Sequence, residues 1–252
     1  MIAIEAVDGL PEINEGDDLA ALIADRSQPQ DGDIVVIAQK VVSKAEGRLR
    51  ALADVTPSPE AERIAIQTDK DPRLVQLILD ESSQVLRAVP GVLIVETHHG
   101  FVCANAGIDA SNLAGASDSL LLLPVDPDAS ARHLRSELQT RTGKQLAVLI
   151  ADSFGRAWRS GQADVAIGCA GIAPLQDLRG ETDRDGRELA ATVIATADEI
   201  AGAADLARAK DSGQPVVIVR GRGDLVTRDD GPGAAAGLRS RAEDLFRDAK
   251  TG

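Results

Sequence analysis

Short runs of Val, Ile and Leu recur along the chain, and longer polar stretches with helical character separate them. The runs lack strict alternation of apolar and polar positions, which is the pattern of strands covered on both faces. Predicted strands therefore cover residues 34–38, 92–96, 120–125, 146–151 and 216–220. Strands that alternate with helices are typical of α/β proteins, and we expect that fold class here.

The segments between the strands carry recognisable helix signals. Two Asp-Pro pairs each place a capping carboxylate before a proline in the first helical turn, and they predict helices over residues 72–82 and 127–141. Residues 186–210 predict a long Ala-rich helix or a helix pair, and residues 234–250 predict an amphipathic helix. No internal repeat or clear linker divides the chain, so we expect a single domain over residues 1–252.

Composition narrows the range of partners. Of the 252 residues, 44% are hydrophobic, which suffices for a core and excludes disorder. Lys plus Arg number 27 and Asp plus Glu number 40, so the formal net charge is −13 and nucleic acid or anionic lipid is disfavoured. Three Phe, one Trp and no Tyr leave little material for stacking on bases. With disorder and binding to nucleic acid or anionic lipid disfavoured, the composition favours a protein that acts on small molecules.

Neither a signal peptide nor a transmembrane run is expected, because the start of the chain has no basic segment and the apolar runs are too short. Cys103 and Cys169 are too few for a disulfide framework or a four-ligand zinc site. Each lies among small apolar residues, which favours buried free thiols. We therefore expect a cytoplasmic protein.

The first segment with candidate chemistry is residues 33–48, where an apolar strand runs into a polar tail with Gln39, Lys40 and Lys44. Ligand sites of α/β proteins favour the carboxyl ends of strands, and a lysine there can meet a phosphate. An ordinary exposed strand end is the alternative. The chain has no Walker-type loop, so any nucleotide must be held in another way.

Two further segments place oxygen ligands after strands. Asp109 and Asn112 follow Gly107, and they predict either a site for Mg²⁺ or Mn²⁺ or an Asx-type turn. Asp152 and Ser153 directly follow the strand at residues 146–151, where a metal site could be held rigidly.

Arg156 and Arg159 come next and flank Trp158, the only tryptophan. The two arginines could bind phosphate or carboxylate groups. The alternative is that Asp152 caps a helix and the arginines form surface pairs. If Asp109 and Asp152 lie close together, they could hold one divalent cation against a phosphate, and the residues then predict a metal-assisted enzyme acting on a phosphorylated small molecule.

Five stretches of the chain, taken in order, resemble the coenzyme F420-0:L-glutamate ligase family in its stand-alone form. They are residues 9–19, 32–48, 104–112, 152–162 and 164–168. The resemblance implies an enzyme that uses GTP and Mg²⁺ or Mn²⁺, with K⁺ as a further candidate, to join L-glutamate to the deazaflavin F420-0. The implied course passes through an acyl phosphate and gives F420-1 and longer γ-linked tails. The implied fold is a mixed sheet with flanking helices, in a two-part single chain that forms an intertwined homodimer.

On matched positions, the resemblance assigns GTP contacts to Leu10, Pro11, Glu12, Ile13, Gln39, Lys44 and Asn112. It assigns one metal ion to Asp109 and Asp152, which would be the catalytic pair, and a second to Ser153 with Asp152. Arg156 and Arg159 are our candidates for the carboxylates of glutamate. Two other functions stay open, a metal-dependent phosphohydrolase and a non-catalytic deazaflavin-binding module.

Overall fold

The computed structural model describes residues 1–109, 119–208 and 213–246. Its helices are α1 (Leu19–Ser27), α2 (Gln39–Ala45), α3 (Pro59–Thr68), α4 (Pro72–Asp80), α5 (Pro127–Thr142) and α6 (Thr196–Asp205). Its strands are β1 (Ala3–Ala6), β2 (Ile34–Ala38), β3 (Leu49–Ala51), β4 (Ser82–Val89), β5 (Val92–Thr97), β6 (Val102–Ala104), β7 (Ser119–Leu121), β8 (Ala147–Arg156), β9 (Arg159–Ala170), β10 (Gln176–Asp177), β11 (Val193–Ile194) and β12 (Val216–Arg220). Among the residues so described, no helix is both long enough and apolar enough to cross a membrane.

The central sheet is five-stranded, with the order β1-β12-β2-β8-β9. β2 and β8 run parallel, in a register that sets Ile34 opposite Ala147 and Ala38 opposite Ala151, whereas the other neighbours are antiparallel. The first four residues of β2 are buried, as expected for a strand covered on both faces. The predicted α/β class and mixed sheet are therefore confirmed.

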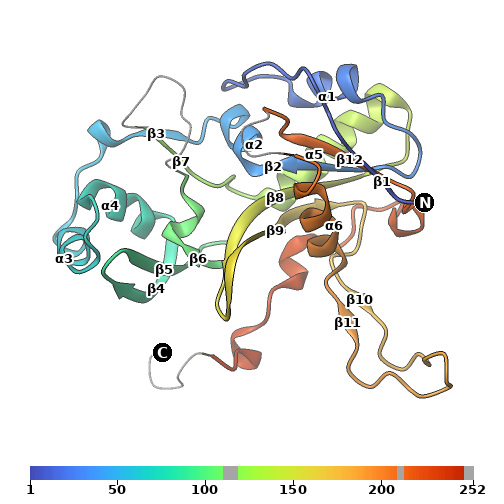
Figure 1. Cartoon of the computed structure of the whole chain (residues 1–252). Coiled ribbons are helices and arrows are strands. Elements are labelled where there is room, and N and C mark those ends of the chain that lie inside the picture. Colours follow the sequence, from blue (N-terminus) through green and yellow to red (C-terminus); the bar gives the residue numbers. More distant parts are fainter. Residues whose placement is uncertain (110–118, 209–212, 247–252) are drawn as a thin grey trace.

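Helices cover both faces of this sheet (Figure 1). On one face, α1, α2 and α5 pack against alternate strand residues such as Val35, Val148 and Ile150. On the other face, α6 packs its alanines against the intervening residues, such as Val36 and Leu149. Of these flanking helices, α5 was predicted and α6 lies within the predicted segment 186–210, whereas α1 and α2 were not predicted. Both cysteines are buried free thiols, as predicted.

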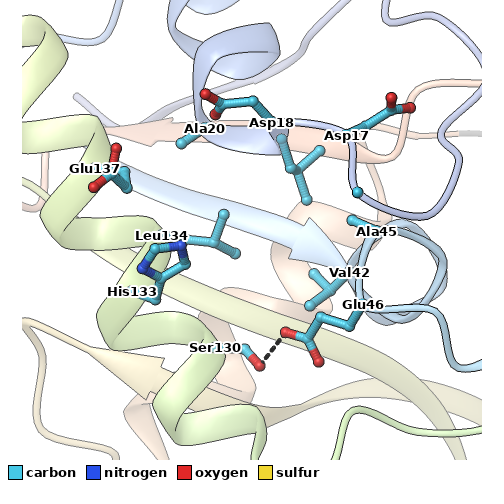
Figure 2. Close-up of a pocket in the computed structure, with 12 residues that line it drawn as sticks. Asp17, Asp18, Ala20, Val42, Ala45, Glu46, Ser130, His133, Leu134 and Glu137 are labelled. Carbon is cyan, nitrogen blue, oxygen red and sulfur yellow. Dashed lines mark hydrogen bonds between the residues drawn. The ribbon is translucent and has the colours of Figure 1, made fainter.

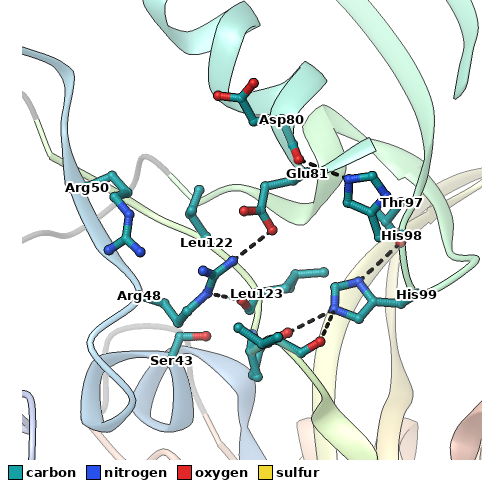
Figure 3. Close-up of polar contacts among 12 residues, drawn as sticks. Ser43, Arg48, Arg50, Asp80, Glu81, Thr97, His98, His99, Leu122 and Leu123 are labelled. Atoms are coloured by element: carbon teal, nitrogen blue, oxygen red, sulfur yellow. Dashed lines mark hydrogen bonds and ion pairs between the residues drawn. The ribbon is translucent and has the colours of Figure 1, made fainter. Parts of the chain in front are cut away.

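A third buried cluster forms between α3, α4 and the antiparallel sheet β4-β5-β6. Arg48 connects this cluster to the rest of the chain, because its Nε donates to the Leu123 carbonyl at 2.7 Å and its Nη2 pairs with Glu81 at 2.8 Å (Figure 3). His99 adds a second connection through contacts to the Pro124 and Val125 carbonyls. These polar contacts hold the segment after β7 in its buried path.

The strands predicted at residues 34–38, 92–96, 146–151 and 216–220 are confirmed, as are the helices at residues 72–82 and 127–141. Both helices begin at the predicted Asp-Pro pairs. Asp71 accepts from the Arg73 amide and Asp126 from the Ala129 amide, and each proline occupies the first turn.

The strand predicted at residues 120–125 is only partly right. β7 ends at Leu121, because its partner β3 is short and Pro124 has no amide proton to continue a ladder. Leu122 and Leu123 nevertheless stay buried, held by the contacts of Arg48. Burial of these apolar residues therefore does not require a strand.

The long helix predicted at residues 186–210 is wrong over its first part. Gly186 adopts φ +78°, and the Asp183 carboxylate accepts from the Asp185 and Arg187 amides, which fixes a turn there. The chain then forms β11, pairs with β10, and becomes helical only in α6. Residues 209–212 lie outside the described residues.

The predicted C-terminal helix at residues 234–250 is also wrong within the described residues. The chain forms two short 3₁₀ turns, Ala234–Gly237 and Arg241–Glu243. The Asp128 carboxylate accepts from the Ala234 and Ala235 amides, and Arg241 pairs with Glu96 at 3.0 Å. These long-range contacts stretch the segment across the molecule and override its helical pattern.

Gly168 provides a test of this packing. A Cβ at this position would overlap the carbonyl of Pro127, where β9 meets the first turn of α5. We expect Gly168→Ala to lower the free energy of unfolding by about 1–3 kcal/mol in urea denaturation. Gly155→Ala is the matched control in the same hairpin, because a Cβ there meets nothing within 4 Å. Equal stability of the two variants would contradict the packing.

Candidate functional site

The candidate site lies where the parallel pairing of β2 with β8 ends, at Ala38 and Ala151. β2 leads directly into α2, so Lys40 lies in the first turn of that helix. β8 continues to Arg156, so Asp152 and Ser153 lie within the strand, just past the paired part, and do not follow its end as predicted. The Lys40 ammonium pairs with Asp109 at 2.8 Å. The site therefore collects residues from three of the segments that the sequence singled out.

Asp152 has an unusual electrostatic environment. Burial away from water raises its pKa to about 7, and repulsion from Asp164 and Asp109 adds to the rise against a hydrogen bond from the Ser153 amide. Burial raises the pKa of the Cys103 thiol to about 12, and repulsion from the Asp152 carboxylate adds to that rise. Asp109 and Asp152, predicted as a pair, therefore lie close enough to interact.

α2 extends the site toward the N-terminal residues. Lys40 and Lys44 are four residues apart and so share one helix face. Lys44 forms an ion pair with Glu12. Within the predicted stretch of residues 10–13, Ile13 is buried and Leu10 packs against the same core cluster, whereas Pro11 and Glu12 are exposed. One helix face thus links Glu12 to Asp109 through two lysines.

Gln39 lies deeper than the other predicted nucleotide contacts. Its side chain is buried, and Nε2 donates to the Ser43 hydroxyl at 2.6 Å and to the Leu122 carbonyl at 3.3 Å. In this arrangement Gln39 ties α2 to the segment after β7. Asn112, the remaining predicted contact, lies outside the described residues.

A separate cavity of about 330 Å³ opens between α1, α2 and α5 (Figure 2). The ionisable side chains that line this cavity are His133 and four carboxylates, those of Asp17, Asp18, Glu46 and Glu137. Burial raises the pKa of Glu46, which also accepts a hydrogen bond from Ser130. Negative charge of this density disfavours phosphate, so the lysine-bearing face of α2 is the better candidate for a nucleotide.

Ser153 faces a different set of partners from Asp152. Neighbouring residues on a strand point to opposite faces. Ser153 donates to Asp164, its cross-strand partner on β9, at 2.6 Å. Asp164 is 3% exposed and also pairs with Arg208, whose Nη1 is buried without a hydrogen-bond partner. The predicted metal ligand Ser153 therefore belongs to a Ser153–Asp164–Arg208 group beside Asp152.

Sequence reasoning named Lys40 in the polar tail of residues 33–48, where a lysine could meet a phosphate, but it assigned no role to Asp164 or Arg208. Asp164 could have been found only from the hairpin register that sets it opposite Ser153. No sequence signal places Arg208, which follows α6 and reaches the site only through the fold.

The predicted carboxylate-binding arginines lie elsewhere. Arg156 and Arg159 flank the turn of the β8–β9 hairpin and are exposed, with Arg156 donating to the Ser160 carbonyl. At about 3.3 Å per residue, Arg156 is roughly 13 Å along the strand from Asp152. Within one chain, the structure does not bring these arginines to the paired aspartates.

The donor set fits a divalent cation that also binds a phosphate. Among the described residues, no group of three or more His, Cys, Asp or Glu side chains could hold a metal ion by itself. Mg²⁺ commonly takes one or two carboxylates and completes its shell with water and substrate phosphates. Asp109 and Asp152 could supply that part, and the pKa of Asp152 is raised chiefly because its carboxylate is buried, with repulsion from Asp164 and Asp109 adding to the rise.

The electrostatics of Asp152 generate a stability test on metal-free protein. Its folded pKa of about 7 exceeds the unfolded value, so the folded state retains a proton between roughly pH 4 and 7 and loses stability as pH rises through that window. Asp152→Asn removes the cost of ionising this buried carboxylate. The substitution should therefore stabilise the protein by up to about 4 kcal/mol at pH 8 and by little near pH 4. Urea denaturation with a chelator measures this, and a pH-independent difference would contradict it.

Comparison with known proteins identifies the family of this chain. The family model described as F420-0:Gamma-glutamyl ligase matches residues 9–221. The coenzyme F420:L-glutamate ligase of Methanothermobacter thermautotrophicus is 47% identical over 98% of this chain and 99% of its own length. The enzyme of that name from Methanopyrus kandleri is 44% identical over 98% of both chains, and the one from Halobacterium salinarum is 50% identical over 85% of both chains. This chain therefore belongs to the F420-0:gamma-glutamyl ligase family of enzymes.

Proposed function

We propose that this protein joins L-glutamate to the deazaflavin F420-0, driven by GTP and assisted by Mg²⁺ or Mn²⁺, with K⁺ as a further candidate. The observation that carries the proposal is the meeting of Asp109, Asp152 and Lys40 where the parallel pairing of β2 with β8 ends. The names of the relatives support glutamate ligation to F420. GTP, the metal and the course of the reaction are our extension.

The proposed course has two steps. The γ-phosphoryl group of GTP moves to an oxygen of the substrate carboxylate, which gives an acyl phosphate and GDP. The amine of glutamate then attacks the acyl carbon, a C–N bond forms, the C–O bond to phosphate breaks, and the amine loses a proton. Repetition on the new carboxylate would extend the γ-linked tail beyond F420-1.

The residues of the site suit the charge of this reaction. A divalent cation held by Asp109 and Asp152 would neutralise negative charge on the transferring phosphoryl group. Lys40 and Lys44 are each paired with a carboxylate, and both can exchange it for a phosphate oxygen. Because the chain is strongly acidic, such local positive groups are needed to bind anionic substrates.

The assignments of Leu10, Pro11, Glu12, Ile13, Gln39, Lys44 and Asn112 to GTP are part of the proposal. The Lys44–Glu12 pair supports it, because it joins the two stretches that bear most of these residues. The second metal site at Ser153 and the glutamate contacts of Arg156 and Arg159 stay proposals too. The exposed arginines would need a partner subunit or a hairpin movement to approach Asp152.

We also propose a two-part chain that assembles into an intertwined homodimer. The separate cluster around α3 and α4 supports the two parts. The β8–β9 hairpin projects beyond the sheet (Figure 1) and carries Trp158 at its turn, where the side chain is 79% exposed. Such an arm offers an apolar contact to a second copy.

Assembly can be tested by sedimentation. We expect the wild-type protein to sediment as a dimer and Trp158→Asp to shift it toward monomer by at least tenfold in dissociation constant. Ile66→Asp on α3 is the matched control, because Ile66 is similarly exposed at 86% and lies far from the hairpin. A monomeric wild-type protein would contradict the proposed dimer.

The reaction is tested by mass spectrometry of F420-0 incubated with the protein, GTP, Mn²⁺ and L-glutamate. We expect products heavier by one or more glutamyl units and a matching release of GDP. Asp152→Asn should lose at least 100-fold in kcat while remaining folded, since it removes a charge needed for cation binding. Phosphate release that needs no glutamate would favour a phosphohydrolase, and F420-0 binding without GTP consumption would favour a non-catalytic module.

A further inference from the structure

The aromatic residues of this chain gather at one place. The sequence holds three Phe, one Trp and no Tyr. Phe101 and Phe154 meet edge to face with their ring centroids 6.0 Å apart. Trp158 and Phe246 lie 5.9 Å apart at the hairpin turn. All four rings therefore lie on or against the β8–β9 hairpin, whereas the rest of the core is aliphatic.

A cavity of about 230 Å³ lies beside this hairpin, at the edge of the central sheet. Phe101 and Phe154 form one part of its wall, and Leu175 and Leu238 form another. Asp198 is the only charged residue of the lining, and its carboxylate accepts a hydrogen bond from the Ala166 amide at 3.0 Å. The cavity is thus mainly apolar, with aromatic walls and one acceptor.

The cavity adjoins the paired aspartates. Phe154 follows Asp152 by two residues on β8, so both side chains point to the same face of the sheet. Val165, which also lines the cavity, is the direct cross-strand partner of Asp152. A ligand in the cavity would therefore reach the reacting groups along the hairpin.

The C-terminal segment completes the wall. Leu238 and its neighbour Gly237 line the cavity, and they are held there by the contacts of Asp128 and by the Arg241–Glu96 pair. These residues lie beyond residues 9–221, which the family model matches. The C-terminal segment, which within the described residues forms short 3₁₀ turns, therefore helps to form the cavity wall.

We propose that this cavity binds the deazaflavin ring of the substrate, an inference that rests on the proposed function. A flat aromatic ring system stacks well on aromatic and aliphatic walls. The volume is below the roughly 300–1,000 Å³ of drug-sized sites, so the cavity suits one ring system of a larger ligand. The substrate carboxylate, at the other end of the molecule, would then extend toward Asp152.

Guanine is the competing occupant, and the structure favours the deazaflavin. Both rings carry hydrogen-bonding groups along one edge, so position separates them: none of the described residues that we assign to GTP lines this cavity. The lysine-bearing face of α2, with the Lys44–Glu12 pair, offers more charge to a nucleotide. Two anionic substrates would thus approach Asp109 and Asp152 from separate sides.

The test uses a substitution that fills the cavity. Leu175 lies on a loop and is partly exposed, so Leu175→Trp should fold and occupy the space of the ring. Equilibrium dialysis with the free deazaflavin chromophore, which lacks the phosphate tail, should show at least tenfold weaker binding than to wild type. The KM for F420-0 should rise by a similar factor, with the KM for GTP unchanged and kcat within about threefold.

Two further variants keep the test falsifiable. Leu238→Ser removes an apolar part of the wall without adding bulk, and we expect severalfold weaker chromophore binding. Ile66→Trp places the same indole on α3, away from the cavity, and should leave every parameter unchanged. Circular dichroism of all variants establishes that they are folded.

Three results would overturn the ring assignment. The first is equal chromophore affinity in wild type and Leu175→Trp. The second is a rise in the KM for GTP instead of the KM for F420-0. The third is a shift of Leu175→Trp to monomer, which would mean that a second copy covers the cavity. The ligase proposal fails separately. If the chromophore binds wild type in a Leu175-dependent way and F420-0 gains no glutamate, the ring site stands and the ligase falls.

Discussion

The parallel pairing of β2 and β8 is the constraint on which the rest of the site depends. Parallel neighbours end at the same edge of a sheet, so the residues that follow each strand are brought together whatever their distance in sequence. β2 and the part of β8 that pairs with it are buried on both faces, which leaves no room for a charged side chain within the paired part. Lys40 and Asp152 stand at the first positions where charge can be accommodated.

The site gathers like charges, and the fold compensates for them only in part. Lys40 offsets Asp109 and Arg208 offsets Asp164, whereas Asp152 keeps a raised pKa because burial and both neighbouring carboxylates oppose its ionisation. An arrangement selected for stability alone would not place three carboxylates within interaction range. Such a cost is typical of positions kept for binding or catalysis.

Local signals in the sequence were sufficient for much of this fold. The strands at residues 34–38 and 216–220 and the helices after Asp71 and Asp126 depend on burial and capping, which neighbouring residues encode. The segments at residues 186–210 and 234–250 were mispredicted because a side-chain turn at Asp183 and distant contacts to Asp128 and Glu96 decide them. Asp109 and Asp152 were identifiable as candidate metal ligands, but their proximity needed the strand order, and Arg208 needed the whole fold.

The ion pairs of α2 explain how an acidic protein can present a site for anions. Lys40 and Lys44 share one face, and each is paired with a carboxylate from a different segment. In the function that we propose, a cation that takes Asp109 as a ligand would weaken the Lys40–Asp109 pair, and the ammonium could then turn toward a phosphate. Cation and nucleotide binding would then reinforce each other, because the cation competes for the carboxylate and the phosphate for the ammonium of the same pair. A net charge of −13 is compatible with this exchange, since the local pairing decides which groups can meet the ligand.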